Sequence, residues 1–420
     1  GRHPCSNAMP TAERLPLFAV TAPGLETVAA SELADLGITA APEPGGAAWD
    51  GTLEELYDAN LRSRTASRIL LRVAEFRART FFELERHARR IPWERFVAPG
   101  RPVRFRVTAR KSRLYHEGAI AQRLLEAVER RTGPLAAAPD RRTPIEDRGP
   151  AANGAPTSAP HRPASDEDDG DDAQLFVVRF LRDHCTLSAD TSGALLHRRG
   201  YRQALAKAPL RETLAAAMLL AACWDPDAPL LDPMCGSGTI AIEGALLARR
   251  IAPGLANPER HPRDFAFRHW PDFDAGAWDR VVDRAAAAIR PGAPTPILAS
   301  DRDAGAIRAA HDNASRAGVL DDLGLDVRPL SAVEPPAGPG WLITNPPYGT
   351  RIGERRSLRD LYAALGNFAR RRLPGWTIAL LSPDRALEAQ LRIPLAPAFD
   401  TRNGGIPVRL AVGRVGGSGG

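Results

Sequence analysis

Leu231-Asp-Pro-Met-Cys-Gly-Ser-Gly-Thr239 is the clearest indication of the fold class, because its pattern predicts a strand, a glycine turn and the start of a helix. The apolar strand ends in Asp232, the turn contains Gly236 and Gly238, and the helix begins at Thr239. Glycine lets the backbone approach a ligand closely, and a helix N-terminus offers free N–H groups. In doubly wound sheets this first turn lies where cofactors bind. The stretch therefore predicts a Rossmann-like α/β domain with a cofactor at the turn.

The residues after the turn narrow the cofactor class. A dinucleotide site requires a third glycine after Gly238 and a P-loop requires a lysine, and the sequence has neither. Asp301 ends the next expected strand, where a carboxylate can accept both hydroxyls of a ribose. It lies 69 residues after Asp232, whereas about 20 is usual, which predicts an inserted element within residues 251–294. Asp301 could instead be a plain turn residue, and Asp303 is expected to cap the following helix.

A second motif, Thr344-Asn-Pro-Pro-Tyr-Gly349, follows a strand expected over residues 340–344. Its two prolines lack N–H donors, which leaves the side-chain oxygen of Asn345 and the carbonyl of Pro346 as convergent acceptors. Such a pair can hold both hydrogens of an –NH2 group, and Tyr348 can stack on a planar base, a contact worth about 1–3 kcal/mol. The motif predicts an exocyclic amine as the reacting group; a rigid turn is the alternative. The catalytic candidates are Asn345, Pro346, Pro347 and Tyr348.

Positive charge is concentrated in one region. Residues 61–131 contain 19 Lys and Arg against 7 Glu and no Asp, a net charge of +12, whereas the whole chain carries +6. Within this region, residues 102–108 alternate apolar and basic, which predicts a half-buried strand whose exposed face carries Arg104 and Arg106. The charge predicts a polyphosphate partner such as nucleic acid. A GC-rich genome with solvated arginines would explain the preference for Arg over Lys, but not the local imbalance.

Composition and pattern divide the chain into segments. Residues 136–174 are dense in Ala, Pro, Gly, Ser and Asp and cannot bury enough apolar surface to order themselves. From Tyr201 onward, strands alternate with helices, the signature of a parallel sheet. The expected segments are an expression-tag remnant (1–8), a small α+β subdomain (9–60), the basic module (61–190) with its disordered insertion (136–174), a linker (191–205) and the α/β domain (206–415).

Several classes of protein are excluded by composition. No apolar run is long enough for a membrane-spanning helix, which needs about 18 residues. The 4 cysteines lack the spacing of a zinc site or a disulfide framework, and no signal peptide precedes Met9. We therefore expect no metal, no membrane contact and a cytoplasmic location.

These motifs carry a resemblance to a known family. The turn resembles the first motif of S-adenosylmethionine-dependent methyltransferases, and with the Asn345 motif the C-terminal half is similar to N6-adenine and N2-guanine methyltransferases. Over residues 17–412 the chain resembles THUMP-containing enzymes, and among them the bacterial 23S rRNA (guanine-N2)-methyltransferases, once described as adenine-specific DNA methylases. Further stretches that carry the resemblance are Leu17-Phe-Ala-Val-Thr-Ala-Pro-Gly-Leu-Glu26, Ser112-Arg-Leu-Tyr-His116, Tyr201-Arg-Gln-Ala, Ala208-Pro-Leu-Arg-Glu-Thr213 and Tyr348-Gly-Thr-Arg-Ile-Gly353.

The resemblance implies a ferredoxin-like subdomain at 9–60, a THUMP RNA-binding domain at 61–190, and methyl transfer from S-adenosylmethionine to N2 of a guanine in 23S rRNA. It implies cofactor contacts from Pro209, Leu210, Arg211, Glu212, Thr213, Asp232, Pro233, Met234, Cys235, Gly236, Gly238, Thr239, Asp301, Arg302, Ser331 and Asn345. It implies RNA contacts from Arg104, Arg106, Arg110, Lys111, Arg113, Tyr115, His116 and Arg351.

Some features depart from the family pattern or leave alternatives open. Many relatives carry an Asp in the third cofactor motif, whereas this chain has Val327-Arg-Pro-Leu-Ser331, so Ser331 or a backbone carbonyl would bind the adenine amino group. Some relatives continue into a second methyltransferase domain; this chain ends at Gly420, so no second activity is expected. Arg211 and Glu212 could form a structural ion pair. Alternative functions are methylation of guanine N2 in tRNA or of adenine N6, and non-catalytic RNA binding.

Overall fold

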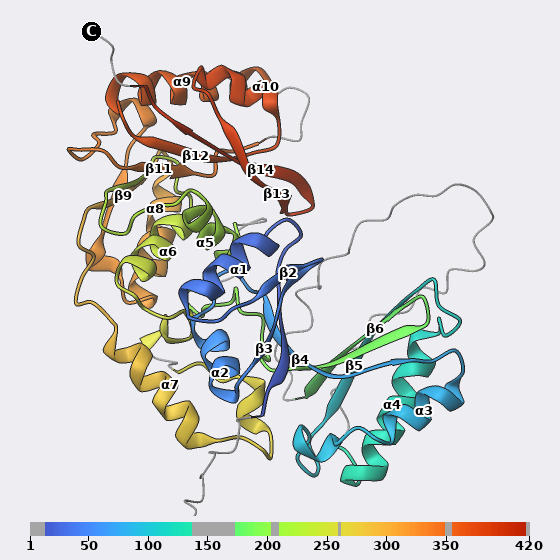
Figure 1. Cartoon of the computed structure of the whole chain (residues 1–420). Coiled ribbons are helices and arrows are strands. Elements are labelled where there is room, and N and C mark those ends of the chain that lie inside the picture. The colour runs from blue at the N-terminus through green and yellow to red at the C-terminus, as the bar shows by residue number, and fades with distance from the viewer. Residues whose placement is uncertain (1–12, 137–172, 203–209, 259–261, 349–354, 417–420) are drawn as a thin grey trace, which may run out of the picture. The chain divides into compact units, whose positions relative to one another are not determined.

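Two separately packed units make up the chain in the computed structural model, which describes residues 13–136, 173–202, 210–258, 262–348 and 355–416. Unit 1 comprises residues 1–69, 196–264 and 274–420, and unit 2 comprises residues 70–195 and 265–273. Figure 1 shows the elements of both. The expected tag, residues 137–172 of the expected insertion, Pro209 and Arg351 lie outside the described residues.

A seven-stranded sheet in the order β10-β9-β8-β11-β12-β14-β13 forms the centre of unit 1. Neighbours from β10 to β12 are parallel, and β14 runs antiparallel to both β12 and β13. The chain moves from β8 outward to β9 and β10, and then returns to the other side of β8 with β11, so the strand order reverses between β8 and β11. The predicted Rossmann-like α/β fold is confirmed. The strands are β8 (Leu230–Asp232), β9 (Ile297–Asp301), β10 (Leu323–Val327), β11 (Trp341–Thr344), β12 (Thr377–Ser382), β13 (Ala396–Asn403) and β14 (Ile406–Arg414).

Helices cover both faces of this sheet, as Figure 1 shows, with α9 and α10 on one face and α5, α6 and α8 on the other. Helix α9 buries Tyr362 and Leu365 against Leu342 and Ile378 of the sheet. None of the helices in the described ranges is long and apolar enough to cross a membrane. The helices of this part are α5 (Glu212–Ala221), α6 (Thr239–Ala248), α7 (Ala275–Ala287), α8 (Ala304–Arg316), α9 (Arg355–Arg372) and α10 (Arg385–Glu388).

Unit 1 also contains the N-terminal subdomain, defined here as residues 13–67, in which β3 pairs antiparallel with both β1 and β2. A buried polar network joins it to the larger sheet domain. The Arg199 guanidinium donates to the Arg64 carbonyl (2.6 Å) and lies 3.4 Å from the Glu243 carboxylate, which also accepts from the Tyr201 hydroxyl (2.9 Å). The Arg64 guanidinium donates to the Ile251 carbonyl (2.7 Å), and burial lowers its pKa to about 10. The elements are β1 (Leu15–Val20), α1 (Glu26–Asp35), β2 (Ala41–Glu43), β3 (Gly46–Gly51) and α2 (Leu53–Arg62).

Unit 2 contains four neighbouring strands in the order β4-β7-β6-β5, in which β5 and β6 are parallel. An aromatic core of Trp93, Phe105, Phe176 and Phe96 packs edge to face and stacked. Trp270, from the element that the sequence predicts within residues 251–294, stacks edgewise on Phe96 and donates to the buried Gln174 side chain (2.7 Å). Part of that insertion therefore completes the core of unit 2. The elements are β4 (Arg68–Arg77), α3 (Phe81–Ala88), β5 (Val103–Arg110), α4 (Glu117–Thr132), β6 (Gln174–Leu181) and β7 (His184–Asp190).

The close packing of the turn at Gly238 can be tested by substitution. Its φ is +81°, and a Cβ there would lie 2.9 Å from the Cβ of Ala310 on α8. Gly375, in the same unit, has a φ of +80°, but a Cβ there would meet no atom within 4 Å. We expect Gly375→Ala to lower the free energy of unfolding by about 1 kcal/mol and Gly238→Ala by about 2–4 kcal/mol in urea titrations, because only the latter adds a clash to the backbone strain. Equal losses would contradict this account.

Candidate active site

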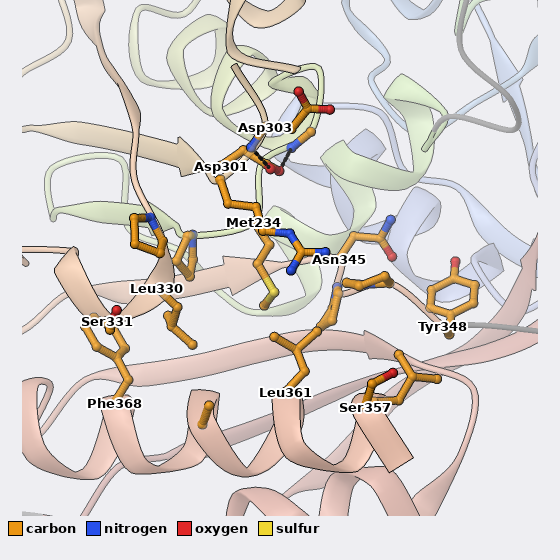
Figure 2. A pocket seen from close by; sticks show the side chains of 18 of the residues that line it. Met234, Asp301, Asp303, Leu330, Ser331, Asn345, Tyr348, Ser357, Leu361 and Phe368 are labelled. Atoms are coloured by element: carbon orange, nitrogen blue, oxygen red, sulfur yellow. Dashed lines mark hydrogen bonds between the residues drawn. The ribbon is translucent and has the colours of Figure 1, made fainter. Parts of the chain in front are cut away.

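A cavity of about 1430 Å³ opens at the carboxyl ends of β8 and β11, where the strand order reverses. Pro233, Met234 and Gly236 of the glycine turn line it, and so do Asp301 and the corner Asn345–Tyr348. Figure 2 shows Met234, Asp301, Asn345 and Tyr348 around one space, with Leu361 and Phe368 along one side of it. The two loops that carry the predicted chemistry, far apart in the sequence, therefore meet at one site.

A buried side-chain hydrogen bond joins the two loops. Backbone pairing between β8 and β11 covers Trp341↔Leu230 and Leu342↔Leu231. Beyond these pairs, the Thr344 hydroxyl donates to the Asp232 carboxylate at 2.7 Å, and both residues are buried. The same carboxylate oxygen accepts the backbone N–H of Met234 (3.2 Å). Asp232 therefore links the end of β11 to the start of the glycine turn through two hydrogen bonds.

Hydrogen bonds hold the glycine turn on one side, and on the other side Gly236 faces free space. The backbone N–H of Gly236 donates to the Asp301 carboxylate (3.0 Å), and the side-chain amide of Asn313 on α8 donates to the Ser237 carbonyl (3.1 Å). A Cβ at Gly236 would meet no atom within 4 Å, so the turn faces free space. Glycine at this position leaves room for a ligand against the backbone.

Asp301 lies at the carboxyl end of β9 and lines the cavity, as the sequence predicts. Its second oxygen accepts the backbone N–H of Asp303 (3.0 Å), and Figure 2 marks this contact. Asp303 in turn accepts the Gly305 N–H (2.7 Å) as the N-cap of α8, which confirms its predicted role. Asp301 thus braces the turn and also presents a carboxylate to the cavity.

The corner formed by Asn345–Tyr348, called the acceptor corner below, contains a buried hydrogen-bond acceptor that lacks a donor among the described residues. The side-chain oxygen of Asn345 is buried, and no residue that the structure describes donates a hydrogen bond to it. Pro346 is buried and Pro347 exposed. The Tyr348 hydroxyl accepts from the side-chain amide of Asn403, and burial raises the pKa of this phenol, which keeps it neutral. The corner therefore offers an unsatisfied oxygen next to a neutral aromatic ring.

The other predicted cofactor residues divide into two groups. Arg302 and Ser331 line the cavity, whereas Asp232, Cys235, Gly238 and Thr239 form the support behind the turn. Segment 210–213 is held next to Thr239 by Arg202, whose guanidinium donates to the Leu210 carbonyl (2.8 Å) and to the Thr239 hydroxyl. Glu212 forms an ion pair with Arg202 (3.4 Å), a partner that the sequence did not suggest for it.

Two walls of the cavity were not predicted from the sequence. Helix α9 contributes Leu361 and Phe368, and the β13–β14 hairpin contributes Asn403 and Gly404. Ser331 lies in a turn that packs on α9, and Figure 2 shows it toward the same end of the cavity as Phe368, away from Tyr348. The helical spacing of Leu358, Leu361, Leu365 and Phe368 and the Asn403-Gly-Gly-Ile406 hairpin signal could have indicated these elements.

The predicted RNA-contacting residues lie in unit 2, apart from Arg351. Arg110 ends β5, and the loop after it carries Lys111, Arg113, Tyr115 and His116. The side chains of all five residues are exposed. The Tyr115 ring is 64% exposed and lies 4.1 Å from the His116 ring, so an aromatic pair stands among cations.

The base of this loop is fixed by Asp183, which accepts the backbone N–H of Arg113 (2.8 Å). Arg104 and Arg106, by contrast, are half-buried, although the sequence predicted an exposed basic face on this strand. Among the described residues, no group of three His, Cys, Asp or Glu side chains could hold a metal ion.

Known proteins resemble the chain over nearly its whole length. The model of the RMKL-like methyltransferase domain matches residues 199–410, and that of the RlmL ferredoxin-like domain matches residues 16–70. A Synechocystis protein named as a candidate RNA methyltransferase is 35% identical over 94% of this chain and 95% of its own length. The ribosomal RNA large subunit methyltransferase K/L of Syntrophotalea carbinolica is 37% identical over 94% of this chain, which spans 53% of that relative. The crystal structure of SMU.472, a candidate methyltransferase complexed with SAH, has a TM-score of 0.78 at 29% identity and covers 98% of this chain and 100% of its own.

The buried Asp232 makes stability depend on pH. Burial raises the pKa of its carboxyl group from 3.8 to about 7, against the opposing hydrogen bond from Thr344. Between about pH 4 and pH 7 the folded protein therefore holds a proton that the unfolded chain has released. We expect the free energy of unfolding to fall as the pH rises through this interval, by at most about 1.4 kcal/mol per pH unit from this group.

Asp232→Asn keeps an oxygen that can accept from Thr344 but cannot ionise. Denaturant titrations of both proteins from about pH 5 to pH 8 should show the variant gaining stability relative to the natural chain as the pH rises. A difference that stays constant across this range would mean that Asp232 does not titrate there.

Proposed function

The chain belongs to the RMKL-like methyltransferase family, and from that premise we propose that it methylates the exocyclic N2 amine of a guanine in structured RNA, with 23S rRNA as the substrate. The cofactor is S-adenosylmethionine, because the similar SMU.472 structure holds SAH, the product that remains after methyl transfer. The observation that carries the choice of an amine is the buried, unpartnered side-chain oxygen of Asn345 among the residues described.

Asn345 and Pro346 orient the acceptor. A buried acceptor without a donor costs about 1–3 kcal/mol, and an –NH2 group of the substrate would satisfy it. One amine hydrogen is accepted by the Asn345 oxygen and the other by the Pro346 carbonyl, which turns the nitrogen lone pair toward the glycine turn. Tyr348, whose phenol is neutral because burial raises its pKa, stacks on the base. The base must leave its helix to reach this depth, as in other enzymes that act on bases.

Methyl transfer between these loops depends on alignment. S-adenosylmethionine would supply a methyl group bound to a positively charged sulfur. The thioether that leaves is neutral, so its departure needs no acid catalyst. What the protein contributes is in-line placement of the amine, and the bond between Thr344 and Asp232 sets the spacing of the two loops. No histidine lines the cavity in the part of the chain that the structure describes, which is compatible with a reaction that relies on placement.

The cofactor residues fall along the cavity in a consistent order. The Gly236 turn would hold the methionine part, with segment 210–213 beside it, and Asp301 would accept the ribose hydroxyls. Ser331 would accept the adenine amino group, and the Phe368 ring, which the sequence did not indicate, would pack on the adenine. A cavity of about 1430 Å³ leaves room for a nucleobase next to the cofactor.

RNA binding is assigned to the basic module, residues 61–190, as a THUMP domain. The loop with Arg110, Lys111 and Arg113 presents cations to phosphates, and Tyr115 presents a ring for a base. Binding of this kind weakens steeply with salt. A cytoplasmic location, the segment boundaries and the assignment of Arg351 to RNA stay predictions.

Asn345→Ala tests the chemistry. We expect methyl transfer to fall by at least about 100-fold, while the affinity for S-adenosylmethionine in calorimetry stays unchanged, because the variant removes only the amine acceptor. Asn345→Asp, which keeps an oxygen in place, should retain more activity than Asn345→Ala. Full turnover by Asn345→Ala would remove the assigned role, and failure of the natural chain to bind the cofactor would favour a non-catalytic RNA-binding protein.

The identity of the acceptor is tested in cells. Ribosomal RNA and tRNA from strains with and without the gene would be digested to nucleosides and analysed by mass spectrometry. We expect N2-methylguanosine to be lost from one site of 23S rRNA in the deletion strain. A change in tRNA alone, or a loss of N6-methyladenosine, would reject guanine N2 of 23S rRNA and favour one of the alternative acceptors.

A further inference from the structure

The proposed function leaves the N-terminal stretch Leu17–Glu26 without a role. We propose that its turn at Pro23-Gly24 supports the β13–β14 hairpin and that Asn403, at the tip of this hairpin, orients Tyr348 for methyl transfer. Gly24 and Asn403 are then positioning residues, acting on the acceptor corner through the hairpin. This inference rests on the proposed function for its activity measurements and on geometry for the rest.

The turn is a braced structure. Gly24 has a φ of +90°, a backbone conformation that favours glycine. One oxygen of the Glu26 carboxylate accepts the Gly24 N–H (2.8 Å), and the other accepts the N–H of Gly45 between β2 and β3 (3.1 Å). Glu26 therefore fastens the turn to the neighbouring hairpin of the N-terminal subdomain.

The braced turn lies directly against β13. A Cβ at Gly24 would lie 1.7 Å from the carbonyl oxygen of Asp400 and 2.9 Å from its carbonyl carbon. Only a residue without a side chain allows the two backbones to approach so closely. Figure 1 shows the β13–β14 hairpin beside the N-terminal subdomain, in the same unit. The contact fixes β13 close to the hairpin tip.

The tip of the β13–β14 hairpin reaches the cavity and contacts Tyr348. Asn403 pairs with Ile406 across Gly404 and Gly405, whose φ values of +55° and +84° are those of a tight two-residue hairpin turn. The Arg402 guanidinium closes the turn by donating to the Gly405 carbonyl (2.8 Å). Asn403, Gly404 and Ile406 line the cavity, and the Asn403 amide donates to the Tyr348 hydroxyl.

The contacts from Gly24 to β13 and from Asn403 to Tyr348 would fix the orientation of the Tyr348 ring. The ring follows two prolines and is half-buried. The hydrogen bond from the Asn403 amide to its hydroxyl favours one orientation of the ring. Small displacements of a group that holds a substrate can lower a rate strongly even when binding of the other substrate is intact.

Enzyme kinetics with the full-length chain and 23S rRNA fragments would test the route. We expect Asn403→Ala and Gly24→Ala to lower kcat by roughly tenfold, with the affinity for S-adenosylmethionine unchanged. In the Tyr348→Phe background, which lacks the hydroxyl, Asn403→Ala should cause no further loss. An additive loss would show that Asn403 acts independently of Tyr348 and would overturn the proposal.

A matched glycine variant separates contact from backbone strain. Gly37, in the same subdomain, has a φ of +83° with no atom within 4 Å of a Cβ. Gly37→Ala should therefore leave kcat unchanged, and it should lower the thermal stability less than Gly24→Ala because it adds backbone strain without a clash. If both glycine variants lower kcat alike, or if neither does, Gly24 does not support the hairpin.

Fluorine NMR of fluorotyrosine-labelled protein gives a readout that does not depend on methyl transfer. The chain has 5 tyrosines, and Tyr348→Phe assigns the resonance of interest. Asn403→Ala and Gly24→Ala should shift this resonance, and Gly37→Ala should not. If the natural chain fails to methylate guanine while these shifts are seen, the proposed function fails and the inference about Tyr348 stands. If the resonance does not move in Asn403→Ala, the inference fails whatever the activity.

Discussion

The hydrogen bond between Thr344 and Asp232 is the contact on which the site depends. In a doubly wound sheet the two strands at the switch point send their following loops in different directions, so a crevice opens between them. Backbone pairing between β8 and β11 covers only two residue pairs. Beyond it, a side-chain bond between two buried residues sets how far apart the donor and acceptor loops stand.

This arrangement has an energetic consequence for the carboxylate. Asp232 accepts from Thr344 and from the Met234 backbone through one oxygen, and its other oxygen is buried without a hydrogen bond from any described residue. Burial raises its pKa to about 7, so the charged form is held at a cost. Asp301, by contrast, spreads two hydrogen bonds over its two oxygens at the edge of the cavity. The two acidic residues therefore differ in position: Asp232 is buried behind the loops and Asp301 faces the cavity.

The sequence predicted the local motifs of the site, but it did not predict the other elements that line the cavity. The Gly236 turn, the cap at Asp303 and the corner at Asn345 are each specified by adjacent residues, because glycine, aspartate and proline restrict the backbone where they stand. Phe368 and Asn403 reach the cavity from elements that come later in the chain, and only the sheet order brings them there. Arg104 is half-buried for a similar reason, since alternation indicates a face of a strand but not what covers it. Trp270 completes the core of unit 2 from an insertion within the other unit, which no local pattern could indicate.

In the proposed function, the unpartnered oxygen of Asn345 would let the site select an amine without acid–base residues. A buried acceptor is costly when it is empty, and a carbonyl on a substrate would repel it, whereas an –NH2 group satisfies it. Selection would therefore come from the free-energy penalty of placing a base edge without an –NH2 group against this oxygen, as in other sites where a wrong substrate leaves a buried polar group unpaired. The two prolines extend this effect because they remove the N–H groups that could otherwise have bonded to the oxygen. The same restriction that makes the corner rigid thus also keeps its acceptor free for the substrate.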